Sequence, residues 1–152
     1  MNLVASSALL ICFLISAAPA VGAHMDNLHL VKRIYLGSII GDRNEELPIN
    51  NILKREFEKN GFIIVDEAAK SDAILTGSIM SELPLDDKGS DQPRYFHEVK
   101  LTSPGGVELW KATIKFYSDL TDSERMEKGA RRIVERIFND WKKSAKKAGI
   151  KP

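Results

Sequence analysis

The stretch Ser-Asp-Ala-Ile-Leu-Thr-Gly-Ser-Ile-Met-Ser-Glu-Leu, residues 71–83, decides the fold that this sequence predicts. Its apolar residues alternate with polar ones, so Ala73, Leu75 and Ile79 share one face of a strand. Gly77 lies on the same face and has no side chain to pack, which indicates that a helix or a bulky neighbour approaches closely. We therefore expect this strand at the centre of a small sheet.

Two further strands are expected after the central one. Residues 95–102 and 107–117 both alternate apolar and polar side chains, and Ser-Pro-Gly-Gly at residues 103–106 is a strong turn signal between them. The polar connection at residues 84–93 is typical of an exposed hairpin tip. Residues 71–117 are thus predicted to form a three-stranded meander.

The residues before the central strand predict a strand, a helix and a second strand. Residues 24–29 are interpreted as a polar lead-in, and residues 30–39, rich in branched and aromatic side chains, predict the first strand. Residues 47–60 place apolar side chains at helical spacing, and Gly61 follows as a stop. Residues 62–65 are apolar without alternation, which favours a strand at the sheet centre or covered on both faces.

The last element is the clearest helix of the sequence. Thr121 and Glu124 are spaced as a capping box, and an apolar stripe at helical spacing follows towards Gly149. The elements together predict an α+β fold: a two-layer sandwich in which two amphipathic helices pack on one face of a mostly antiparallel sheet of about five strands. Residues 24–152 have the length of a single domain with one core.

Residues 1–23 predict a secretory signal peptide. No charged side chain occurs between Leu3 and Ala23, and an apolar block is followed by small residues and Pro19. Cleavage after Ala23 is preferred, and cleavage after Ala20 also fits the small-x-small rule. Because no lysine or arginine precedes the apolar block, an uncleaved amino-terminal membrane anchor is the alternative. The leader predicts a periplasmic or secreted protein.

Charge and cysteine content exclude several classes of chemistry. The formal net charge of +1 gives no global reason to expect nucleic acid, and the predicted compartment also excludes it. Cys12 is the only cysteine and lies in the leader, so the mature chain has no thiol for a disulfide, a thiolate metal site or nucleophilic catalysis. Lipidation is not expected, because Leu10 and Ile11 precede Cys12 where a lipoprotein signal needs small residues.

No motif for nucleophilic catalysis or for a metal is found. Ser78 lies within the central strand and lacks the strand-to-helix turn of a nucleophile elbow. His24, His29 and His97 have no spacing that places two of them on one helix face.

The acidic connection is a weak candidate for calcium. Asp86, Asp87 and Asp91 supply carboxylates, but their spacing does not match an EF-hand and a solvated loop is favoured. We therefore predict no catalytic residue, no metal ligand and no cofactor, and we expect the protein not to be an enzyme.

Positive charge gathers at the end of the last helix. Lys142, Lys143, Lys146 and Lys147 fall in its final turns, where positive charge complements the helix dipole. These lysines are a candidate basic contact surface for acidic partners or, weakly, for an anionic membrane. A solvated helix face is the competing interpretation.

Four segments resemble a known group of proteins. They are Val-Lys-Arg-Ile-Tyr-Leu-Gly at residues 31–37, Lys-Asn-Gly-Phe at 59–62, Val-Asp at 65–66 and Ser-Asp-Ala-Ile-Leu-Thr-Gly-Ser-Ile at 71–79. In this order they are similar to small bacterial envelope proteins, with related domains in the curli-secretion lipoprotein, the lipopolysaccharide-assembly lipoprotein and the amino-terminal domain of the Tol-system propeller protein. The chain lacks the lipobox of many such proteins. The resemblance implies an accessory role in envelope assembly or transport through protein contacts.

Two functions are expected on these grounds. The first is a non-catalytic periplasmic accessory or assembly module that contacts an envelope protein through a sheet edge or the open sheet face. The alternative is a carrier of a small apolar or lipid ligand between helices and sheet. The carrier needs a cavity beneath Trp110 and Trp141, whereas their apolar positions favour core packing. The partner, the ligand and the oligomeric state are left open.

Overall fold

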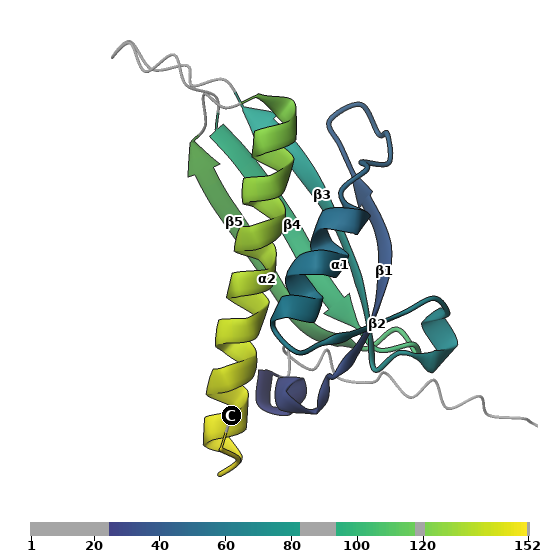
Figure 1. Ribbon diagram of the computed structural model, residues 1–152, viewed down its shortest axis with the longest axis vertical. Coiled ribbons are helices and arrows are strands. Elements are labelled where there is room, and N and C mark those ends of the chain that lie inside the picture. Colours follow the sequence, from purple (N-terminus) through teal and green to yellow (C-terminus); the bar gives the residue numbers. More distant parts are fainter. Residues whose placement is uncertain (1–24, 83–93, 118–120, 152) are drawn as a thin grey trace, which may run out of the picture.

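Five strands form one mixed sheet, and two α-helices lie on one of its faces (Figure 1). The computed structural model describes residues 25–82, 94–117 and 121–151; the leader and the loop with Asp86, Asp87 and Asp91 lie outside them. The strands are β1 Arg33–Ile40, β2 Ile63–Val65, β3 Ala73–Glu82, β4 Arg94–Thr102 and β5 Glu108–Tyr117. The helices are α1 Asn50–Lys59, α2 Asp122–Lys147 and the short 3-10 helices η1 Met25–Leu30 and η2 Ala68–Lys70. The predicted α+β class is confirmed.

β3 is the central strand, as the sequence predicts. The strand order is β2-β1-β3-β4-β5, and the antiparallel pairs β3–β4 and β4–β5 confirm the meander. A Cβ added at Gly77 would lie 2.5 Å from the carbonyl oxygen of Glu98. The backbone of the neighbouring strand, and not a helix, is therefore what approaches this glycine.

β1 and β2 differ from the sequence prediction. β1 pairs parallel with both β2 and β3, so the sheet is mixed and its antiparallel part is the meander. β2 is an edge strand and is neither central nor covered on both faces, since Ile63 is 57% exposed. The prediction of a covered strand is wrong because only part of the apolar run is buried: Phe62, just before the strand, packs in the core.

The residues before β1 are not a polar lead-in. They form η1, in which Leu28 is fully buried, and the strand begins only at Arg33. The main-chain N–H of His29 donates to Ser144 Oγ on α2 at 3.1 Å. A single buried leucine and this contact with the helix explain why a polar-looking segment is folded against the core.

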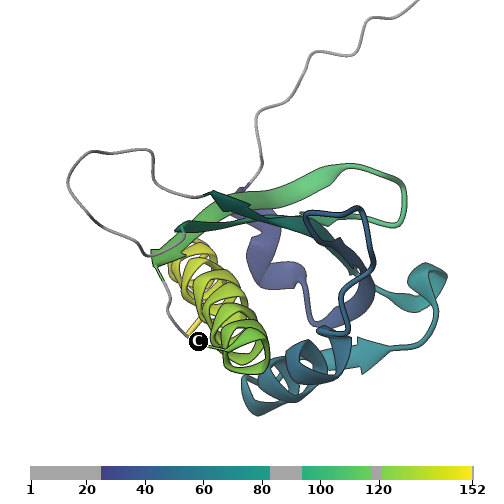
Figure 2. The same cartoon turned by 90° about the horizontal axis from the view of Figure 1, so that it is seen from above.

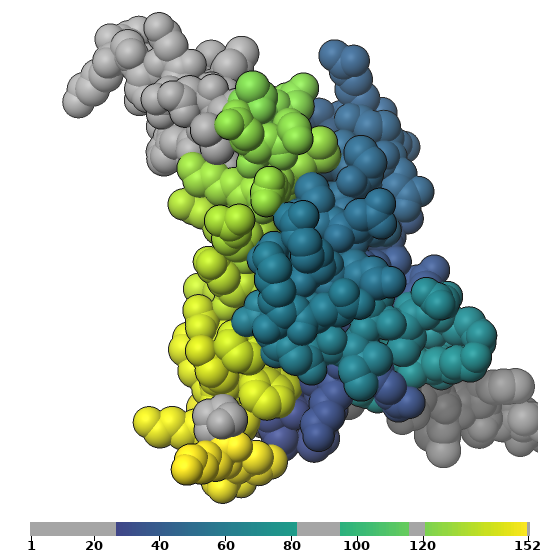
Figure 3. Space-filling model, in the orientation of Figure 1, coloured from purple at the N-terminus to yellow at the C-terminus, as the bar shows by residue number. Residues whose placement is uncertain are grey.

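The core fills the space between the sheet and the helices. Figure 2 shows both helices on the same side of the sheet. In Figure 3 the side chains of α1 and α2 contact each other, and together they cover much of this face of the sheet. Both helices bury one apolar stripe, as their periodicity predicts. The fully buried side chains of the core include Ile34, Ile39, Leu53, Phe57, Leu75, Leu101, Ile133 and Ile137.

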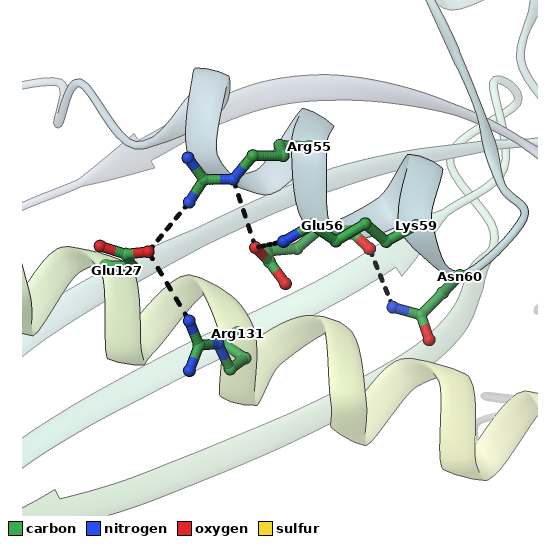
Figure 4. Close-up of polar contacts among 6 residues, drawn as sticks. All are labelled: Arg55, Glu56, Lys59, Asn60, Glu127 and Arg131. Carbon is green, nitrogen blue, oxygen red and sulfur yellow. Dashed lines mark hydrogen bonds and ion pairs between the residues drawn. The ribbon is translucent and has the colours of Figure 1, made fainter.

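A polar bridge joins α1 to α2 (Figure 4). Arg55 on α1 donates to Glu127 on α2 at 3.0 Å, and Arg131 lies 3.6 Å from the same carboxylate. Glu56, which is 6% exposed, accepts a hydrogen bond from Lys59 at 2.8 Å. Exposed pairs such as Arg55–Glu127 contribute only about 0.2–1 kcal/mol each.

α2 begins with the predicted capping box and then approaches β4 closely. The Glu124 carboxylate accepts from the Thr121 N–H at 3.1 Å, and the Thr121 hydroxyl accepts from the Glu124 N–H at 3.5 Å. Further along the helix, a Cβ added at Gly129 would collide with the imidazole of His97. Gly129 therefore lets the helix cross the sheet directly above a buried histidine.

Replacing Gly129 by alanine is expected to destabilise the fold by about 1–3 kcal/mol, because the new methyl group overlaps the ring of His97. The higher helix propensity of alanine, about 1 kcal/mol, offsets part of this loss. Urea unfolding followed by circular dichroism measures the net loss in the free energy of unfolding, and the exposed Lys146→Ala is the control. The loss should shrink in a His97→Ala background. A Gly129→Ala protein as stable as the wild type would contradict this packing.

Candidate functional site

β5 is an outer strand of the sheet, and within the described residues it pairs with β4 alone (Figure 1). Arg132 on α2 donates from Nη1 to the carbonyl oxygen of Lys115 at 3.3 Å, so this carbonyl faces away from β4. Main-chain groups alternate sides along a strand, hence those of Thr113 and Lys111 also face outward. The sheet thus ends in a row of main-chain donors and acceptors.

A shallow groove separates this edge from α2. Its volume is about 330 Å³, and it is lined by residues 113–115 of β5 and by Arg132, Glu135, Arg136 and Asn139 of α2. Arg132 contacts Lys115 while Asp140 contacts Trp110, so α2 and β5 run alongside each other in opposite directions here. One wall of the groove is strand backbone, and the other is a helix face with charged side chains.

A buried carboxylate fixes α2 against β5. Asp140 is 2% exposed and accepts hydrogen bonds from the indole of Trp110 (3.1 Å), from Nε of Arg136 (3.1 Å) and from Nζ of Lys143 (2.9 Å). Desolvation by itself raises the pKa of Asp140, but the hydrogen bonds from Lys143 and Trp110 and the charge of Arg136 outweigh it and lower the pKa. Asp140 is therefore ionised at neutral pH and holds Arg136 at the groove.

The candidate basic surface at the end of α2 is not uniform. Lys143 is paired with the carboxylate just described, and Lys142 has its Nζ 4.4 Å from the centroid of the Phe138 ring. Lys146 and Lys147 lie exposed on the last turn. Contact of these lysines with a membrane or an acidic partner stays a prediction.

A second hollow opens beside the amino-terminal end of α2. It has a volume of about 460 Å³, and acidic and basic residues both line it, among them Asp42, Arg43 and Arg125. Asp42 accepts a hydrogen bond from the Ser81 N–H at 2.8 Å, and the Arg125 guanidinium lies 4.6 Å from the Tyr95 ring centroid. Because charges of both signs are mixed, the hollow has no clear preference for a charged ligand.

His97 lies at the inner wall of this second hollow. It is 1% exposed, and burial lowers its pKa to about 4, with the charge of Arg132 acting in the same direction. The imidazole is therefore neutral at physiological pH.

A third hollow, of about 250 Å³, is the structural counterpart of the carrier hypothesis. It lies between the end of α1, the start of β1 and α2, and Phe62, Phe138 and Trp141 line it. Phe138 and Trp141 are stacked with an interplanar angle of 15°, and the indole of Trp141 donates to the carbonyl of Val31 at 3.0 Å. Trp110 lies elsewhere in the core and is 1% exposed. The two tryptophans do not line one common cavity.

Residues 25–82, 94–117 and 121–151 contain neither a metal cluster nor a membrane-spanning helix. No cluster of three or more His, Cys, Asp or Glu side chains there is arranged to hold a metal ion. None of the helices in these ranges has the length and apolar character needed to cross a bilayer.

Sequence reasoning missed Arg132 and Arg136 as site residues. The available signal was the repeat of Lys128, Arg132 and Arg136 at four-residue spacing, which places three cations on one side of a helix. The sequence did not show that this side lies next to the edge strand, because the order of strands in a sheet is a tertiary property.

Comparison with known proteins identifies the fold. No family model and no curated protein matches the chain. The hypothetical protein CT253 from Chlamydia trachomatis is similar in structure, with a TM-score of 0.52, 8% identity and coverage of 73% of this chain and 98% of that one. A PelC dodecamer from Paraburkholderia phytofirmans has a TM-score of 0.50, 16% identity and coverage of 70% and 87%. A minor lipoprotein from Acinetobacter baumannii has a TM-score of 0.47 and 12% identity, and the match covers 72% of this chain and 92% of that one.

The chain shares its fold with PelC and CT253. At identities of 16% and 8% the likeness shows the fold alone. The narrower resemblance to the curli, lipopolysaccharide-assembly and Tol proteins stays a prediction.

Acidification is expected to weaken the fold through His97. The unfolded pKa of about 6.5 lies above the folded value of about 4, so the unfolded chain takes up the proton first. Stability is unaffected above pH 6.5 and falls between about 6.5 and 4, by about 2 kcal/mol from pH 7.5 to pH 5. Urea unfolding at the two values measures this loss, and His97→Gln should remove most of it. Titration of the His97 ring by NMR is an independent check, and a midpoint near 6.5 would refute the assignment.

Removing the Asp140 carboxylate is expected to loosen α2 from β5. Asp140→Ala leaves the buried indole N–H of Trp110 without its acceptor, at a cost of about 1–3 kcal/mol. Asp140→Asn keeps an acceptor of the same shape and should cost clearly less. Glu135→Ala, on the exposed side of the helix, is the control for urea unfolding. Equal losses of stability in the alanine and asparagine variants would show that the Trp110 hydrogen bond is not the cause of the loss.

Proposed function

We propose that the protein is a non-catalytic, envelope-associated module that acts by binding another protein along the edge of β5. In this role it needs no metal and no cofactor. Binding is proposed at a surface, because the described residues offer an uncovered strand beside a groove.

The observation that carries the proposal is the outer edge of β5, which pairs with no further strand among the described residues. The strand has ten residues, and the main-chain groups of Lys111, Thr113 and Lys115 face away from β4. An extended segment of a partner gains main-chain hydrogen bonds along such an edge, and pockets beside the edge select its side chains. The groove between β5 and α2 supplies those side-chain contacts.

The lysines of this edge favour selective pairing. Lys111 and Lys115 are exposed, and Nζ of Lys115 lies 5.3 Å from the centroid of the Phe96 ring on the open face of the sheet. Charged side chains on an edge strand oppose indiscriminate pairing with other strands. A partner must therefore compensate this charge, which restricts the number of acceptable sequences.

The envelope location is supported by residues 1–23 and by the resemblance to envelope proteins. A leader cleaved after Ala23 releases a periplasmic or secreted domain, and an uncleaved leader anchors the same domain. PelC, which has the same fold, forms a dodecamer, so this arrangement of helices and sheet is compatible with protein contacts.

The carrier function has weaker support. The aromatic hollow at Trp141 has a volume of about 250 Å³, which is below the range of about 300–1,000 Å³ typical of sites that enclose a small molecule. Trp110 is buried and bonded to Asp140, so it offers no face to a ligand. An acyl chain would need more room than the hollow provides.

Site-specific photocross-linking in the native host tests the proposed function. A benzoylphenylalanine at position 113 should form an adduct with a partner protein, whereas one at exposed position 54 on α1 should not. Thr113→Pro, combined with the cross-linker at position 111, should abolish the adduct, because proline removes an outward N–H without touching the β4 ladder. Equal adducts at positions 54 and 113, or adducts that survive Thr113→Pro, would refute binding at this edge.

A further inference from the structure

The helix wall of the groove carries two arginines and one acidic residue. Arg132 and Arg136 line the groove beside Glu135 and Asn139, and Lys128 and Lys143 precede and follow them along α2. The carboxylate of Asp140 is already occupied by Trp110, Arg136 and Lys143. Lys115 adds positive charge on the strand wall.

Arg132 currently covers part of the edge. Its Nη1 donates to the outward carbonyl of Lys115 at 3.3 Å, a long hydrogen bond from a side chain that is itself exposed. A main-chain N–H from an added strand would satisfy this carbonyl in its place. The guanidinium would then turn to the side chains of the added strand, and a carboxylate is the group that it binds best.

The spacing of the two arginines fits an extended chain. Arg132 and Arg136 are one helical turn apart, about 6 Å along the axis of α2. Side chains two residues apart on one face of a strand are about 6.7 Å apart. Because α2 and β5 run alongside each other here, acidic residues at positions i and i+2 of an added strand would reach both arginines.

We propose that the groove takes an extended acidic segment of a partner protein as a sixth strand, with carboxylates two residues apart paired to Arg132 and Arg136. This inference rests on the proposed function and names the chemistry of the partner. A second copy of this chain fits the edge poorly, because two β5 strands side by side would bring the lysines at positions 111 and 115 of each copy together.

Peptide binding to the mature chain, residues 24–152, tests the inference. The probe is a ten-residue peptide with threonine and valine at most positions and glutamate at two positions i and i+2, and the matched peptide carries glutamine there. Isothermal titration at low salt should show about tenfold tighter binding of the glutamate peptide, the sum of two exposed charge-assisted pairs. Amide NMR shifts should change along residues 111–115.

Variants of the arginines locate the effect. Arg132→Gln and Arg136→Gln should each reduce the preference for glutamate about threefold, whereas Arg132→Lys should retain part of it. Arg131→Gln, which removes a cation from the side of α2 that faces α1, should leave it unchanged. Unaltered circular dichroism confirms that each variant is folded, and only Arg136→Gln is expected to lower the urea midpoint, because Asp140 loses one of its donors.

Each remaining outcome decides against the inference. Equal affinity for the two peptides, or an equal loss of the glutamate preference in Arg131→Gln, shows that the groove does not bind carboxylates selectively. Dimers that are lost with Thr113→Pro would assign the edge to a second copy. If cross-linking at position 113 persists while the glutamate preference is absent, the proposed function stands and only the acidic partner is wrong.

Discussion

The buried carboxylate of Asp140 is the interaction on which the functional end of this structure depends. It accepts from Trp110 on β5 and from Arg136 and Lys143 on its own helix, so one ionised group ties the helix to the edge strand. An ionised group at 2% exposure is tolerated only because three donors surround it. Without this contact, the long hydrogen bond from the exposed Arg132 to the Lys115 carbonyl would have to set the distance between α2 and β5, and the groove would have a less defined width.

The kinds of element followed from the sequence because they depend on local periodicity. The strand at Ala73–Glu82, the meander after it and the capped helix from Asp122 all have strong repeating patterns, and the structure contains them. The errors arose where an interpretation required tertiary knowledge. The run before Val65 was apolar enough for a central strand, yet its partners placed it at the edge. The segment around Leu28 had one apolar residue in the right place, which periodicity cannot detect.

The candidate site was less predictable than the fold, for a related reason. A cluster of lysines at the end of a helix is conspicuous in a sequence. Arg132 and Arg136 become candidate site residues only because β5 lies beside them in the fold. Lys143 shows the converse, because its charge is used within the protein to hold Asp140. The chemistry of an edge is therefore a property of two elements together, and a sequence shows the elements one at a time.

The chain enters and leaves the described fold at one pole of the molecule. η1 is held to the last turns of α2 by the bond between His29 and Ser144, and Arg132 precedes Ser144 by twelve residues, about 18 Å of helix. A tether attached at either end of the described fold would therefore be attached at this pole. The groove, which extends along α2 from Arg132 to Asn139, would then have its far end about 18 Å from this pole.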